Sequence, residues 1–482
     1  MELLYILAIP LISASLSMIR TSTQKIAAGG TILGTLAVFI LAWKAAWGLG
    51  HGIEVPGITG WLSCDGFSAL ILLLVSFVGL AAAIFSWGYI SERVGDSGGK
   101  RARQYYRRYN LFLLSMLAVP ILSQVAMVWI AVELTTLLSV FLVSFENTAE
   151  AMEAAWKYVV LTCMGAALAL VGVLILYWGQ SFIATGPFTW AGLSEASSRI
   201  QPVFLKTAFL FILIGFGTKA GLAPLHTWLP DAHSQAPSPV CALLSGVETT
   251  TALYAILRLI PLMDGVSKDN SSTWFIVFGL ISMGTAAFLL IQVKDYKRLF
   301  AFSTIEHMGI ILVAAGLGGE AGYLASTYQV MAHAVTKSFC FFAAGAALLM
   351  TSTREISSVR GLIRTSPIAG ISLMIGGLAI AGAPPFAVFL SEFSIFRASL
   401  AEGRYGVTGL LVLFITIAFG GIMVHVNRMV FGQGLTSPAP RPLPLTCRVT
   451  LAMTVIPVFL LGFYVPEPLH NLLRFAAACF GR

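Results

Sequence analysis

Four charged side chains lie inside stretches of chain that are apolar enough to span a bilayer. They are two lysines and two glutamates, Lys219, Lys337, Glu133 and Glu392. A charge near the centre of a bilayer costs about 3 kcal/mol on insertion scales. Acids and bases held at that depth are typical of the paths along which proteins move ions or protons. The sequence therefore predicts transport chemistry within the membrane.

Other polar and ionisable residues extend this set. Gln329, His333 and Lys337 recur every four residues, so a helix places them on one face. Such a stripe can carry a proton relay through hydrogen-bonded water. The remaining candidates for proton translocation are His226 and Glu248, with Thr250, His233, Glu306 and His307 as secondary candidates.

Lys219 is predicted to pair with an acid on another helix. Glu133 has no basic residue in its own apolar segment, so we expect Lys219 to be its partner. A Glu–Lys contact that forms and breaks would switch the lysine between holding and releasing its proton. A permanent pair that only fixes helix packing is the alternative. For Glu248, the alternative to a place in the proton path is a structural pair with Arg258.

The composition places these residues in an integral membrane protein. Of 482 residues, 57% are hydrophobic and only 10% are charged, whereas soluble domains carry about 25% charged residues. The six cysteines form no C-x-x-C pair and no nucleotide-binding motif is present. We therefore expect no cofactor, no metal and no catalytic centre in this chain. The net charge of +8 fits loops that face an anionic leaflet and does not indicate a nucleic-acid partner.

The apolar segments predict an all-α, polytopic membrane protein with about fourteen transmembrane helices. Their approximate ranges are 3–19, 26–47, 66–90, 110–124, 126–145, 157–178, 204–222, 239–261, 273–292, 298–317, 322–350, 368–400, 407–431 and 449–465.

Two of these segments are predicted to be broken helices. Lys219-Ala-Gly-Leu-Ala-Pro224 resembles Ile380-Ala-Gly-Ala-Pro384, and each lies near a charge within the membrane. Proline ends a regular helix, and non-helical backbone survives at membrane depth only inside protein or beside water. Paired interruptions of this kind are typical of transporters built from repeats.

Basic residues gather in the connections that follow odd-numbered helices. The set comprises Arg20, Lys25, Lys100, Arg101, Arg103, Arg107, Arg108, Lys294, Lys297, Arg298, Arg354, Arg360, Arg364, Arg441 and Arg448. The intervening connections 48–65 and 179–203 carry few basic residues. The positive-inside rule therefore predicts that both termini lie on the outer face of the membrane.

The segment 215–239 identifies a family. With Lys219, His226, Trp228, Pro230 and Asp231 it resembles the proton-translocating antiporter-like subunits of respiratory complex I, Mrp-type antiporters and energy-converting hydrogenases. The resemblance extends to the other intramembrane charges, Glu133, Lys337 and Glu392. The segments 229–237 and 297–310 look most like the hydrogenase-4/formate hydrogenlyase-type subunit. One departure is that helix eight lacks the family's lysine or histidine and offers only Ser245, Glu248 and Thr250.

The resemblance implies an architecture of two inverted five-helix repeats with helices 7 and 12 broken. The corresponding divisions are 1–109 for helices 1–3 and a basic cytoplasmic loop, 110–261 and 262–431 for the two repeats, and 432–482 for helix 14 and the tail.

The implied function is proton translocation in a redox-driven complex of a bacterial or archaeal cytoplasmic membrane. The implied partners are other membrane subunits and, through them, a soluble hydrogenase or dehydrogenase arm. The alternatives are an Mrp-like Na⁺/H⁺ antiporter subunit, a quinone-reactive membrane subunit of complex I type, and a scaffold that anchors a soluble hydrogenase.

Overall fold

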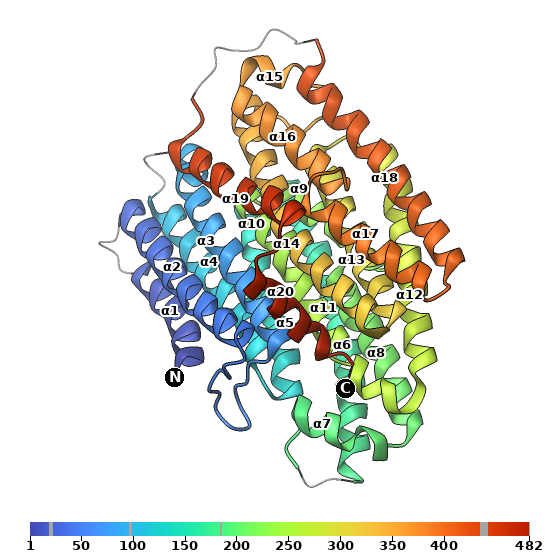
Figure 1. The fold of residues 1–482 in the computed structure, drawn as a ribbon. Coiled ribbons are helices and arrows are strands. Elements are labelled where there is room, and N and C mark those ends of the chain that lie inside the picture. The colour runs from blue at the N-terminus through green and yellow to red at the C-terminus, as the bar shows by residue number, and fades with distance from the viewer. Residues whose placement is uncertain (19–22, 96–98, 184–185, 434–441, 482) are drawn as a thin grey trace.

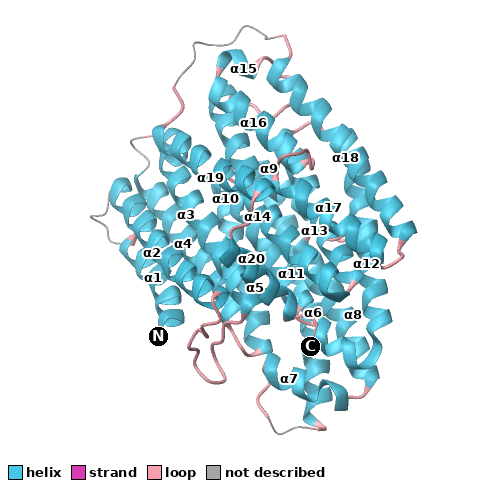
Figure 2. Ribbon diagram, in the orientation of Figure 1, coloured by secondary structure: helices cyan, strands magenta, loops and turns pink. Residues whose placement is uncertain are grey.

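The chain folds almost entirely into helices. The computed structural model describes residues 1–18, 23–95, 99–183, 186–433 and 442–481, apart from the side chains of 264–270. In these ranges no β-strand forms, and only isolated bridges occur (Figure 2). The all-α prediction is confirmed. Of the predicted basic residues, Arg20 and Arg441 lie outside the described ranges.

The helices form long rods that lie beside one another (Figure 1). Their bounds are α1 Glu2–Leu16, α2 Gln24–Gly50, α3 Gly66–Val94, α4 Gly99–Ile121, α5 Val125–Val143, η2 Ser144–Glu146, α6 Ala149–Ser181, α7 Trp190–Ala196, η3 Ser197–Arg199, α8 Pro202–Ala220, α9 Trp228–Gln235, α10 Ser238–Leu243, η4 Leu244–Glu248, α11 Thr249–Leu257, α12 Ile260–Ile291, α13 Tyr296–Leu317, α14 Gly319–Thr351, α15 Leu362–Thr365, α16 Pro367–Ile380, α17 Ala387–Ala401, α18 Tyr405–Phe431, α19 Leu445–Phe463 and α20 Glu467–Ala478.

The lengths and apolar character of these helices confirm a polytopic membrane protein. Within the described residues, 11 helical segments are long and apolar enough to cross a membrane, and α1 and α16 are shorter apolar helices. The total of about fourteen spans and the division into two inverted repeats stay predictions.

The basic segment from Lys100 to Arg108 is not the predicted loop but the first part of α4. Arg101 donates a hydrogen bond of 2.6 Å to the carbonyl of Phe145, and Arg108 one of 3.1 Å to the carbonyl of Phe141. Both guanidinium groups also lie over the rings of these phenylalanines. Because carbonyls at the end of a helix lack partners within it, the end of α5 and the turn η2 that follows offer ready acceptors that favour this arrangement.

Two helices are interrupted where the sequence predicts. α8 ends at Ala220 and α9 begins at Trp228, while α16 ends at Ile380 and α17 begins at Ala387. Each interruption has a glycine with positive φ within its first two residues, 81° at Gly221 and 77° at Gly382. A glycine adopts this conformation without steric penalty, and the prolines that follow have no N–H to continue the helix.

A further irregularity was not predicted. Between α10 and α11 the chain forms a π-helical turn, η4, which carries Ser245 and Glu248. Such a turn contains one residue more than an α-helical turn, and it is often found at functional sites. α14 packs against η4, and α8 packs against α11, which continues from η4. The π-helical turn therefore sets which side chains of residues 244–257 face α8 and α14.

Two helix pairs pack with their backbones in direct contact. A Cβ added to Gly165 of α6 would lie 2.7 Å from the carbonyl oxygen of Gly215 in α8. A Cβ added to Gly279 of α12 would lie 2.7 Å from that of Gly309 in α13. Only glycine permits this approach. α14 is buried along most of its length and contacts α3, α10, α13, α16, α17, α19 and α20.

The two ends of the chain lie in the lower half of Figure 1, where α7 is also found, whereas α15 lies at the top. The amphipathic tail after Pro466 forms α20, which packs against α2, α3 and α14. This arrangement is compatible with the predicted sidedness, which stays a prediction.

Candidate proton-translocation site

The first polar cluster surrounds Lys219 at the end of α8. Its side chain is 3% exposed, and its Nζ lies 2.7 Å from Glu248 Oε1. Nζ also donates hydrogen bonds to Thr136 Oγ1 and, at 3.1 Å, to Tyr158 Oη. The predicted pair of Lys219 with Glu133 is therefore wrong. Because η4 and α11 bring Glu248 against α8, this carboxylate takes the place that we expected for Glu133.

One carboxylate oxygen of Glu248, Oε1, accepts all the hydrogen bonds that this residue receives in the cluster. Besides Lys219, Oε1 accepts from Thr135 Oγ1 at 3.0 Å and from Tyr158 Oη at 2.8 Å. Oε2 is buried and has no hydrogen-bond partner in the described part of the chain. A buried carboxylate with several donors is stabilised in its charged form, and the bare second oxygen offers a place for water or a proton.

The structural alternative for Glu248, a pair with Arg258, is also wrong. Arg258 follows α11 and donates to Asp65 from both terminal guanidinium nitrogens, at 2.5 and 2.7 Å. Asp65 is also the N-cap of α3, where its side chain accepts from the backbone N–H of Ser68. Since the aspartate neutralises Arg258, the arginine fixes α11 to α3 and leaves Glu248 to Lys219.

Glu133 lies apart from this pair, half-buried on α5. The thiol of Cys163 donates to its Oε1 at 2.8 Å, and Oε2 has no partner in the described residues. Its neighbours Ile130 and Leu137 are 48% and 47% exposed. Glu133 therefore borders an apolar outer face of the molecule, not the interior where Lys219 lies.

The second polar cluster surrounds Lys337 on α14, a fully buried side chain. Its Nζ donates to the carbonyl of Phe300 at 2.6 Å and to Ser303 Oγ, both on α13. Among the described residues no carboxylate forms an ion pair with it. Glu306, on the same helix α13 as Ser303, is also buried.

A row of polar side chains runs from η4 past α14 to the second broken helix. Hydrogen bonds link its members except between His333 and His307, where His333 Nδ1 has no partner among the described residues. His333 Nε2 lies 3.1 Å from the carbonyl oxygen of Ser245, and its ring is 5.4 Å from that of His307. Gln329 Nε2 lies 2.9 Å from His307 Nδ1, and Gln329 Oε1 accepts from Ser391.

The row ends at the second break. His307 Nε2 contacts the carbonyl of Ile380, the last residue of α16. The carboxylate of Glu392, the residue after Ser391, sits against Gly382, so that a Cβ on this glycine would collide with it. The predicted stripe of Gln329, His333 and Lys337 thus faces polar partners along its whole length.

Three of the remaining candidates have more local surroundings. Thr250 donates to the carbonyl of Gly246 in its own helix. His226 is half-buried in the break after α8, and its Nδ1 has no hydrogen-bond partner in the described ranges. His233 is fully buried on α9, where Nδ1 lies 2.7 Å from the carbonyl of Leu229 and Nε2 is without a partner among the residues described.

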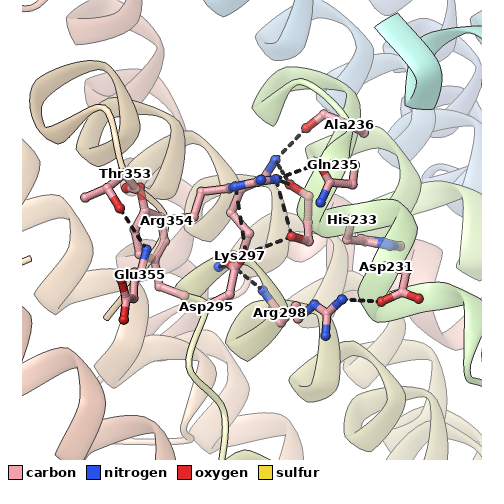
Figure 3. Close-up of polar contacts among 12 residues, drawn as sticks. Asp231, His233, Gln235, Ala236, Asp295, Lys297, Arg298, Thr353, Arg354 and Glu355 are labelled. Carbon is pink, nitrogen blue, oxygen red and sulfur yellow. Dashed lines mark hydrogen bonds and ion pairs between the residues drawn. The ribbon is translucent and has the colours of Figure 1, made fainter. Parts of the chain in front are cut away.

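The C-terminal end of α9 is bound by basic side chains from two other elements (Figure 3). Lys297, in the first turn of α13, donates to the carbonyls of Ser234 and Ala236 at 3.0 and 2.5 Å. Arg354, after α14, donates to the same carbonyl of Ser234 at 2.6 Å. Lys297 was predicted in a loop facing a leaflet, but it is 1% exposed. The negative end of the α9 dipole and its unpaired carbonyls explain this burial.

Several residues of the two clusters were missed in the sequence. They are Thr135, Thr136, Ser139, Tyr158, Cys163, Ser303, Thr304 and Ser391. Hydroxyl groups are common in membrane helices, where they bond to the preceding turn, so their presence alone indicates little. The spacing of Thr135, Thr136 and Ser139 on one face of α5 was the available signal.

Comparison with known proteins gives matches over most of the chain. Residues 123–420 match the family described as NADH:quinone oxidoreductase/Mrp antiporter, transmembrane region. The hydrogenase-4 component F homolog of Methylacidiphilum infernorum is 36% identical over 83% of this chain and 85% of its own. An Na⁺/H⁺ antiporter subunit of Bacillus subtilis is 26% identical over 90% of this chain and 87% of its own.

Solved structures show the same fold. A chain of the membrane-bound sulfane sulfur reductase, an archaeal respiratory membrane complex, superimposes with a TM-score of 0.88 at 26% identity, over 99% of this chain and 97% of that one. A chain of the Mrp complex from Dietzia has a TM-score of 0.85 at 20% identity, over 99% and 97% of the two chains.

Proposed function

Since this chain belongs to the NADH:quinone oxidoreductase/Mrp antiporter family of transmembrane proteins, we propose that it moves protons through the membrane by way of Lys219 and Lys337. The observation that carries the proposal is the Lys219–Glu248 pair, 2.7 Å long, buried, and placed directly before the break of α8. A buried ion pair costs desolvation energy, and non-helical backbone at membrane depth needs protein or water around it. These two costs favour a functional role for the pair.

The pair supplies a switch of adequate size. While Glu248 is close, the charged form of Lys219 is stabilised; when the pair opens, that stabilisation is lost and the proton can leave. Removing one partner of a buried pair costs about 3–5 kcal/mol. Moving one charge against 100 mV costs about 2.3 kcal/mol. A conformational change that opens the pair can therefore release a proton against a membrane potential.

The second cluster would receive and pass on the proton. Ser245 and Glu248 share the turn η4, and Ser245 Oγ lies 2.6 Å from Thr304 Oγ1, next to the Ser303 that binds Lys337. From there His333, His307 and Gln329 lead towards Ser391 and Glu392. We assign proton translocation to Glu133, Lys219, His226, Glu248, His333, Lys337 and Glu392, with Thr250, His233, Glu306 and His307 in secondary roles.

The similarity to a hydrogenase-4 component F homolog favours a place in a redox-driven complex. Its partners would be other membrane subunits and, through them, a soluble hydrogenase or dehydrogenase arm. We place the chain in a bacterial or archaeal cytoplasmic membrane with both termini outside, and retain the divisions 1–109, 110–261, 262–431 and 432–482. The similarity to a component of an Na⁺/H⁺ antiporter supports a second candidate, an Mrp-like antiporter subunit.

Ion flux into vesicles tests this proposal. The full chain is reconstituted with a pH-sensitive dye inside the vesicles, and a potassium diffusion potential drives ions inward, with and without Na⁺. We expect proton uptake in Na⁺-free buffer that Lys219→Ala and Lys337→Ala each abolish. Lys44→Ala is the matched control, because Lys44 is exposed and binds Glu2. Uptake that survives both interior substitutions would show the assignment to be wrong, and flux that requires Na⁺ would favour the antiporter.

A further inference from the structure

Tyr158, on α6, occupies a position that the proposed function leaves unexplained. Its hydroxyl lies within hydrogen-bond distance of both members of the Lys219–Glu248 pair, at 3.1 and 2.8 Å. The ring face of Tyr158 is 5.3 Å from Lys219 Nζ, and the side chain is fully buried. The ring also contacts Trp228 of α9, with 4.8 Å between ring centroids. Tyr158 therefore touches both halves of the broken helix as well as the pair.

The hydroxyl hydrogen of Tyr158 has two acceptors to choose between. Glu248 Oε1 lies 2.8 Å from Tyr158 Oη, and Ser139 Oγ lies 2.7 Å from it. A phenol has a single hydrogen to donate, so it bonds to one of them at a time. Ser139 has a choice as well, because its own hydrogen can go to Tyr158 or to the carbonyl of Thr136 at 3.2 Å.

Thr135 repeats this pattern on α5. Its hydroxyl can donate to Glu248 Oε1 at 3.0 Å or to the carbonyl of Val132 at 2.7 Å. Both neutral donors of Glu248 can thus turn away from it and remain hydrogen-bonded. A buried donor left without an acceptor costs about as much as a lost hydrogen bond, so such a second set of acceptors removes the main obstacle to changing the charge of Glu248.

We propose that Tyr158 is a positioning residue whose hydroxyl switches between Glu248 and Ser139 as a proton passes between Lys219 and Glu248. In the charged pair, Tyr158 donates to the carboxylate and accepts from the ammonium group. When Nζ gives a proton to Oε1, the N–H bond breaks, an O–H bond forms and both groups become neutral. Tyr158 then donates to Ser139, and its oxygen can accept from the new carboxylic acid. This inference rests on the proposed function of Lys219 and adds to it the group that permits transfer.

The groups around Tyr158 come from four elements that contact its side chain. Lys219 faces it from α8 and Glu248 from η4. α5 presents hydroxyl groups, with Glu133 further out and bound to Cys163. α9 presents Trp228, and its Asp231 binds Lys157 and Arg298 near the surface. The Lys219–Glu248 pair is therefore the pair of charged groups next to the hydroxyl.

Two substitutions with opposite predictions test the switch in the vesicle assay. Tyr158→Phe keeps the ring but removes the donor to Glu248 and the acceptor of Lys219. We expect proton uptake to fall about tenfold, as for loss of one hydrogen bond to a charged group, and the acid limb of the pH profile to move to higher pH. Ser139→Ala removes the alternative acceptor, which holds the hydroxyl on Glu248, so the acid limb is expected to move to lower pH.

Tyr109→Phe is the matched control, because Tyr109 is also fully buried and donates to a single carbonyl, that of Gly79, in α3. It should behave as wild type. A second readout, which needs no ion flux, is infrared titration of the carboxylic acid band of Glu248. Glu248→Gln identifies this band by removing it. The switch is refuted if Tyr158→Phe leaves both the infrared band and the pH profile unchanged. It is also refuted if Tyr158→Phe and Ser139→Ala move them in the same direction. If Lys219→Ala conducts normally, the proposed function fails, whereas the infrared result still decides the role of Tyr158.

Discussion

The two buried lysines, Lys219 and Lys337, differ in the groups that bind their ammonium nitrogens. Lys219 has a carboxylate at 2.7 Å, whereas Lys337 has a backbone carbonyl and a serine hydroxyl. A full opposite charge stabilises a buried ammonium group far more than neutral dipoles do. In the proposed path, the site at Lys219 would depend on an ion pair that opens, whereas the described residues give Lys337 no ion pair to open. One protein chain can thus contain a gate and a relay made from the same residue type.

The largest expected effect is the loss of Glu248. Glu248→Leu leaves the Lys219 charge buried without a counter-charge, which should lower the free energy of unfolding by about 3–5 kcal/mol. The double variant Lys219→Met/Glu248→Leu should recover most of this loss. Unfolding of the detergent-solubilised chain by denaturant measures both. Equal losses in the single and double variants would mean that the pair does not hold Lys219.

An intermediate effect is expected at the hydrogen-bonded row beyond Lys337. Gln329→Leu removes the bonds to His307 and Ser391. Leaving buried polar groups without partners should cost about 1–3 kcal/mol. Proton uptake should slow because the row towards Glu392 is interrupted. Leu324→Ala, on the same helix but only partly buried, controls for a general weakening of α14, and a wild-type rate in Gln329→Leu would remove the row from the path.

A smaller effect on stability is expected at Lys337 itself. Lys337→Met removes a buried charge together with its hydrogen bonds to neutral acceptors, and these two contributions oppose each other. The net change in unfolding free energy should stay within about 1 kcal/mol, although uptake is abolished. A loss as large as that of Glu248→Leu would show that Lys337 also depends on a counter-charge and would end the contrast between the two lysines.

The smallest effect is expected at the surface of the basic cluster shown in Figure 3. Arg298 pairs with Asp231, and its side chain is 44% exposed. Arg298→Ala should change stability by less than about 1 kcal/mol, and less still at high salt. Lys297→Met, one residue earlier and buried, should cost more at every salt concentration. The salt dependence of the two melting curves separates a screened surface pair from a buried helix cap.

Residue type predicted the positions of the main charges but not their partners. A lysine in an apolar segment must be buried in protein, so Lys219 and Lys337 could be found without a structure. Gly221 and Gly382, each with prolines after it, likewise predicted the two breaks. The partner of Lys219 could not be predicted, because the π-helical turn at 244–248 changes which face of its segment Glu248 occupies.

Lys297 illustrates a second limit. Counting basic residues in connections assigned it to the surface, whereas the carbonyls at the end of α9, distant in sequence, hold it inside. The hydroxyls of Ser139 and Tyr158 were missed for a related reason. Their significance lies in having two alternative partners on different helices, and this depends on packing that no local pattern encodes.

The close glycine contact between α6 and α8 bears on which of the residues around Lys219 can move. Gly165 and Gly215 bring the two backbones into direct contact, so a side chain at either position would push the helices apart. Tyr158 and Lys219 are carried by these helices, so their separation is set once the chain has folded. A rearrangement of Tyr158, Lys219 and Glu248 would then fall on Glu248, which the five-residue π-helical turn η4 carries.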